Sequence, residues 1–177
     1  GVVANGTDIG DRPELLQRVL RDKGYRTAGF VGGFPLHGRY GWGQGMEVYG
    51  DDFGSVPGLH RLNLVRAWDL LSQRSHTLRE RRADAVVDQA IGWLDRVDAA
   101  PFFMWIHLFD PHAPYEPPVA YRKGFENDPY SGELAFVDDQ VQRLVDAVGD
   151  VPTLFVVVGD HGEGLGEHNQ LYHGLYV

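Results

Sequence analysis

The sequence predicts an α/β fold, in which one sheet is flanked by helices on both faces. Three apolar runs, at 27–31, 102–108 and 153–158, are typical of buried strands. Segments with a helical apolar period separate these runs. Because buried strands that alternate with amphipathic helices build such a sheet, we predict that the three runs are neighbouring or near-neighbouring strands.

The predicted helices have recognisable ends. One begins at Asp11, as the N-cap with Glu14 three residues later, and ends at Gly24 in the left-handed conformation. The second covers 79–97, and the third covers 134–148 and stops near Gly149. Between 32 and 58 the chain is rich in glycine and aromatic residues without a period, so we predict irregular turns there.

Composition limits the possible functions. The 177 residues suit one domain or most of one, and a hydrophobic share of 43% is enough for a core. A formal net charge of -9 argues against a nucleic-acid surface. Without cysteine the chain can form neither disulfides nor a thiolate zinc site. No apolar run is long enough to cross a membrane, and the sequence does not indicate a compartment.

Two predicted strands end in a carboxylate paired with an imidazole. Asp110 and His112 follow the second strand, and Asp160 and His161 follow the third. Ligand sites in such sheets lie beyond the carboxyl ends of the strands, and these groups bind divalent metals and transfer protons. Simpler interpretations stay open: Asp110 before a proline initiates turns, and His112 in a polar loop can be merely solvated. His107, inside an apolar run, is interpreted as a core residue.

The segments that contain these pairs resemble the sulfatase family of the alkaline phosphatase superfamily. The two specific matches are FMWIHLFDPHAPYEPP at 103–118 and VVGDHGEGLGEH at 157–168. Weaker matches at 2–6, 23–31 and 130–139 follow the family's order and spacing. The resemblance covers most of the chain except 34–79. It implies an incomplete alkaline-phosphatase-like fold.

The resemblance also implies a set of site residues. Asp160 and His161 match two ligands of one divalent cation, for which Ca, Mn or Mg is expected ahead of Zn. His112 and His173 match residues that contact the ester's anionic group, and His173 also matches a donor to the leaving group. Asn5 matches an amide residue near the nucleophile. We therefore expect residues 1–177 to be part of a catalytic domain, with a formylglycine segment upstream and a C-terminal subdomain outside the chain.

The function implied is metal-dependent hydrolysis of sulfate esters by a parent enzyme, with the isolated chain inactive. The expected partner is a small-molecule sulfate or phosphate ester rather than a nucleic acid, and no membrane segment is expected in this chain. A phosphodiesterase, phosphatase or phosphonate-ester hydrolase of the same superfamily is one alternative, which the nucleophile's identity would separate. A non-catalytic module that binds anions is another, and upstream acidic ligands and a nucleophile would exclude it.

Overall fold

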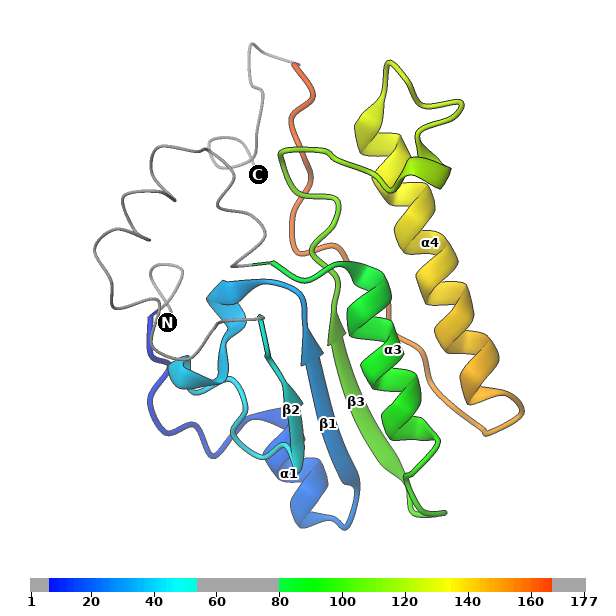
Figure 1. The fold of residues 1–177 in the computed structure, drawn as a ribbon. Coiled ribbons are helices and arrows are strands. Elements are labelled where there is room, and N and C mark those ends of the chain that lie inside the picture. Colours follow the sequence, from blue (N-terminus) through cyan, green and yellow to red (C-terminus); the bar gives the residue numbers. More distant parts are fainter. Residues whose placement is uncertain (1–6, 54–79, 167–177) are drawn as a thin grey trace. The chain divides into compact units, whose positions relative to one another are not determined.

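The computed structural model describes residues 7–53 and 80–166, and the chain divides into two compact units after Ala147. The first unit contains a three-stranded parallel sheet in the order β2-β1-β3 (Figure 1). The central strand is paired on both sides, with Ala28 opposite Val48 on one side and Met104 on the other. The strands are β1 (Arg26–Val31), β2 (Val48–Gly50) and β3 (Phe102–His107).

The helices cover both faces of this sheet, as the sequence predicts. On one face, Ala28 and Phe30 of β1 pack against Val86, Ala90 and Trp93 in a buried apolar cluster. Helix α4 lies beside α3 on that side (Figure 1), where Arg143 of α4 pairs with Asp88 of α3 at 2.6 Å. No helix among the described residues is long and apolar enough to span a bilayer. The helices are α1 (Leu16–Asp22), α3 (Ala83–Leu94) and α4 (Pro129–Val148), with 3₁₀ turns at Phe34–Leu36, Gly38–Tyr40 and Val119–Tyr121.

The opposite face is covered by α1 and the segment before β2. The Thr27 hydroxyl donates to the carbonyl of Gly45 at 2.8 Å, and the rings of Trp42 and Trp105 lie 6.2 Å apart. Gly45 has a positive φ of 80°, and a Cβ there would lie 2.8 Å from the Arg18 backbone. Glycine therefore allows α1 to approach this segment closely.

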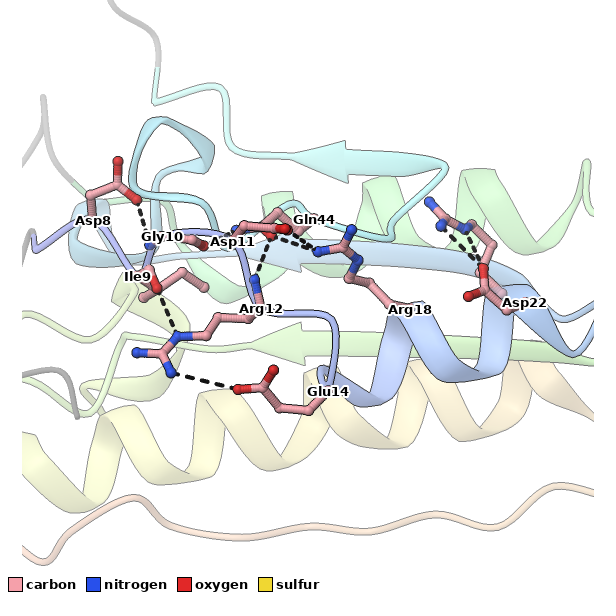
Figure 2. Close-up of polar contacts among 10 residues, drawn as sticks. Asp8, Ile9, Gly10, Asp11, Arg12, Glu14, Arg18, Asp22 and Gln44 are labelled. Carbon is pink, nitrogen blue, oxygen red and sulfur yellow. Dashed lines mark hydrogen bonds and ion pairs between the residues drawn. The ribbon is translucent and has the colours of Figure 1, made fainter.

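Three helix starts differ from the prediction, and α4 begins at Pro129 instead of 134. Helix α1 begins at Leu16 instead of 11, because the carboxylate of Asp11 binds the guanidinium of Arg18 rather than a helical N–H (Figure 2). Gln44 also accepts from Arg18, at 3.1 Å, and from the N–H of Arg12, at 3.2 Å. Helix α3 begins at 83 instead of 79, because Glu80 bridges to Gly33 at the end of β1. The ends at Gly24 and Gly149 are confirmed, with φ of 88° and 60°.

Strands β1 and β3 confirm two of the three predicted strands, but the prediction for 153–158 is wrong. This segment forms no strand in the structure, and its apolar side chains are exposed, Leu154 by 87%. An apolar run shows that side chains favour burial, whereas a strand also needs a hydrogen-bonded neighbour. The described residues of the second unit contain no strand to serve as that neighbour.

Arg81 joins three elements of the first unit at the carboxyl edge of the sheet. Its side chain is 9% exposed and donates to the carbonyls of Val31 at 3.3 Å, Gly50 at 2.9 Å and Ala85 at 3.3 Å. Its own N–H donates to Gly32 at 2.8 Å. Burial lowers the pKa of the guanidinium, but a group of this kind remains charged in proteins. The ends of β1 and β2 and the first turn of α3 are thus held by one cation.

We predict that Arg81→Met lowers the free energy of unfolding by about 3 kcal/mol, because three carbonyls lose a charged donor. Arg81→Lys should recover only part of this loss, since an ammonium lacks the planar fork of donors. Urea denaturation checks both values. Arg21→Met is the matched control, because Arg21 is half-exposed and pairs with its neighbour Asp22. Equal losses in Arg81→Met and the control would contradict the role given to Arg81.

Candidate functional site

The loop after β3 is placed at the carboxyl edge, next to the loop after β1. Val31 and His107, the last residues of the two strands, are opposite each other in the register. A Cβ on Gly33 would lie 2.9 Å from the Phe109 ring, and one on Gly32 would lie 3.1 Å from the carbonyl oxygen of His107. The two glycines therefore leave room for Phe109 and for the chain that follows it.

His112 is half-buried in this loop and its ring orientation is fixed. The imidazole stacks on the Phe109 ring, with centroids 4.4 Å apart and an interplanar angle of 20°. Its Nδ1 lies 2.8 Å from the carbonyl oxygen of Ala113, and its backbone N–H donates to the carbonyl of Asp110 at 2.7 Å. Because a carbonyl oxygen only accepts, this contact assigns the hydrogen of the ring to Nδ1.

Asp110 does more than initiate a turn. Its Oδ2 accepts from the N–H of Ala83, the first residue of α3, at 2.6 Å. The N-cap residue of that helix, Arg82, makes no side-chain cap bond, so Asp110 supplies the cap from a distant part of the chain. Burial raises the pKa of Asp110 to about 6, and the Ala83 N–H and Arg82 oppose that rise.

Glu133 was not predicted by the sequence and is the most buried carboxyl group of this region, at 5% exposure. It lies on α4, and its Oε1 accepts from the N–H of Glu116 at 2.8 Å. Burial raises its pKa to about 8, and the charges of Asp110 and Glu80 add to that rise, so the group is mainly protonated at neutral pH. A signal was present: Glu133, Phe136 and Gln140 share one face of the helix, and all three are buried.

Asp160 and His161 are described within the second unit. The Asp160 Oδ1 and the His161 Nε2 lie 3.8 Å apart, and the Asp160 carboxylate also accepts from the backbone N–H of His161 at 3.1 Å. The imidazole Nδ1 lies 2.8 Å from the carbonyl oxygen of Gly162. Because a carbonyl oxygen only accepts, this contact assigns the hydrogen of the ring to Nδ1.

The other predicted site residues lie elsewhere. Asn5 and His173 lie outside the described residues. Within residues 7–53 and 80–166, no group of three or more His, Cys, Asp or Glu side chains could hold a metal. The structure thus brings together Asp160 and His161, while His112 belongs to the first unit. His107 is half-buried at the end of β3, within a strand as predicted.

The first unit is thus a parallel α/β sheet with Asp110 and His112 in the loop after β3, and the second unit carries Asp160 and His161. The family model described as Sulfatase matches residues 1–176, and the chain therefore belongs to the sulfatase family. Members of this family act on sulfate esters, generally with a divalent metal and a formylglycine.

One curated relative agrees with this assignment, and one solved structure shares the fold. An arylsulfatase of Clostridium perfringens is 23% identical over 51% of this chain and 28% of its own length. A crystal structure titled as Ps i-CgsB in complex with k-i-k-neocarrahexaose has a TM-score of 0.51 and 18% identity, over 81% of this chain and 38% of that one. The second likeness concerns the fold alone. The chain spans well under half the length of either relative.

The raised pKa of Glu133 predicts a pH-dependent difference in stability between the protein and its Glu133→Gln variant. A carboxyl group whose folded pKa of about 8 exceeds its ordinary 4.5 stabilises the fold fully below pH 4.5. This contribution is lost as the pH rises towards 8, and glutamine has no such titration. Melting temperatures between pH 4.5 and 9 should therefore shift in favour of the variant as the pH rises. A difference that is constant over this range would contradict the prediction.

Proposed function

We propose that this chain supplies metal ligands and an anion-binding histidine to the active site of an enzyme that hydrolyses sulfate esters. Membership of the sulfatase family supports the reaction class. The proposed residue roles rest on one contact that His112 and His161 have in common. In both His112 and His161, Nδ1 lies 2.8 Å from the carbonyl oxygen of the next residue. In each ring this leaves Nε2 as the chemically active nitrogen.

In this proposal His112 binds the ester's anionic group. When the ring is protonated, Nε2–H is a charged donor, and stacking on Phe109 fixes its direction. As the ester bond breaks, negative charge grows on the leaving oxygen, and a fixed donor lowers the barrier. His173 and Asn5 complete the proposed contacts: His173 binds the same anion or protonates the leaving oxygen, and Asn5 lies near the nucleophile.

Asp160 and His161 fit two positions in the ligand set of a divalent cation. A carboxylate oxygen and a neutral imidazole nitrogen are both metal ligands, and they lie 3.8 Å apart. The carbonyl of Gly162 on Nδ1 is the partner that commonly orients a ligating histidine. When bound, the cation would neutralise charge on the ester oxygens. One nitrogen among oxygen ligands favours Mn or Mg alongside Ca.

Activity of the parent enzyme tests these roles. We expect metal-dependent hydrolysis of p-nitrophenyl sulfate, and little hydrolysis of a p-nitrophenyl phosphodiester. Asp160→Ala should lower kcat/KM at least about a hundredfold, because losing an outer-shell partner alone commonly costs that much. His112→Ala should lower it by about 10² to 10³, the usual cost of one donor to a developing charge.

Asp150→Ala is the matched control, since Asp150 is an exposed aspartate of the same unit. Full activity in Asp160→Ala would refute the metal assignment. Preference for the phosphodiester would assign the protein to phosphate esters instead.

The isolated 177-residue chain should show no turnover of either ester. Asp160 and His161 are two ligands, whereas tight divalent sites commonly use three or four. No third ligand joins them among the described residues. Isothermal titration with Mn or Ca should accordingly give at most weak binding to the chain alone. Robust metal-dependent turnover by the chain would show that the remaining ligands are already present in it.

A further inference from the structure

The loop that carries His112 is held by carboxyl groups from two directions. At its start, Asp110 accepts from Ala83 N–H at the first turn of α3. At its other end, the backbone of Glu116 donates to Glu133 of α4. Residues 110–116 therefore span from one helix to the other, and His112 lies between the two attachments.

The contact with α4 is close as well as polar. A Cβ on Gly132 would lie 2.8 Å from the carbonyl oxygen of Tyr121 and 3.0 Å from the Pro117 side chain. The rings of Tyr115 and Tyr130 meet edge to face, with centroids 5.3 Å apart. The first turns of α4 thus pack directly on the chain that follows His112, which leaves this end of the loop little freedom to shift.

A glutamate at position 133 is energetically costly. Its Oε2 is buried and has no hydrogen-bond partner among the described residues. Burying a polar group without a partner is unfavourable, and an apolar side chain would fill the same volume without that cost. The hydrogen bond to Glu116 is what an apolar side chain could not provide. Glu133 is therefore better explained by its hydrogen bond to the loop than by its packing in the core.

We propose that Glu133 and Asp110 are positioning residues, which hold the 110–116 loop and keep the His112 imidazole in the geometry that binds the ester's anion. The part that concerns catalysis rests on the function proposed above. The part that concerns the loop does not, because it follows from the two hydrogen bonds. Asp110, Glu80 and Arg82 are the charged groups that act on Glu133, and none of them replaces its bond to Glu116.

The test compares four variants of the full-length protein, one of which is Asp110→Ala. Glu133→Gln keeps an acceptor oxygen for the Glu116 N–H, whereas Glu133→Met keeps the length of the side chain and removes the acceptor. Gln140→Met is the matched control: Gln140 is also 5% exposed, lies on the same face of α4, and bonds Arg143 and Phe136 rather than the loop. Denaturation curves show whether each variant folds.

Amide hydrogen exchange measures the loop directly. In Glu133→Met, the Glu116 amide should exchange at least about tenfold faster, because it has lost its partner. Glu133→Gln and Gln140→Met should exchange there as the unaltered enzyme does. Asp110→Ala should likewise expose the amide of Ala83. Unchanged exchange at Glu116 in Glu133→Met would overturn the proposal.

Steady-state kinetics measures the effect on the site. Glu133→Met should lower kcat/KM by about ten- to a hundredfold, because small misplacements of a catalytic group have effects of this size. Glu133→Gln should restore most of it, and Gln140→Met should keep it. Equal losses in Glu133→Met and Gln140→Met would reduce Glu133 to a structural residue and overturn the proposal. If the unaltered enzyme hydrolyses neither ester, the proposed function fails, and the exchange rates alone decide whether Glu133 holds the loop.

Discussion

The Arg81 guanidinium holds the carboxyl edge of the sheet, and the positions of the surrounding loops depend on it. Strands β1 and β2 end there, and Arg81 donates to one carbonyl at the end of each. A third bond reaches Ala85 in the first turn of α3. A charge that is buried beside three acceptors has few alternative arrangements, because each lost bond would leave a polar group unsatisfied.

This constraint extends along the chain to His112. Since Arg81 holds the approach to α3, the first N–H of that helix, on Ala83, points to a fixed place. Asp110 accepts from it, and the loop therefore leaves β3 in one direction. Glu133 fixes the loop again at Glu116. The ring of His112 thus lies between two polar attachments of its loop, one to α3 and one to α4.

Sequence periodicity predicted β1, β3 and the three helices, because apolar spacing reports directly on burial. Periodicity failed where a neighbouring strand or a packing partner determines the structure. Strand β2 has only three residues and forms because the edge of β1 is available. Within α4 the apolar residue Leu134 is 42% exposed while Glu133 is buried, so the buried face is turned from the one that hydrophobicity favours. The interpretation of Asp110 as a turn residue was incomplete, since its helix partner lies 27 residues away. The pairing of Asp160 with His161 at 3.8 Å agrees with their motif, and their metal-binding role stays a prediction.

The charges around His112 are compatible with an anion despite the net charge of -9. Two carboxyl groups near one loop would repel an incoming sulfate if both were ionised. Glu133, with a pKa of about 8, is mainly neutral at pH 7, and Asp110, with a pKa of about 6, is mainly ionised. The single charge of Asp110 faces the N-terminus of α3, whose dipole and N–H groups offset it, and Arg82 lies near enough to lower its pKa. Ionising Glu133 as well would add a second negative charge beside the proposed anion site, where Arg82 also acts on Glu133.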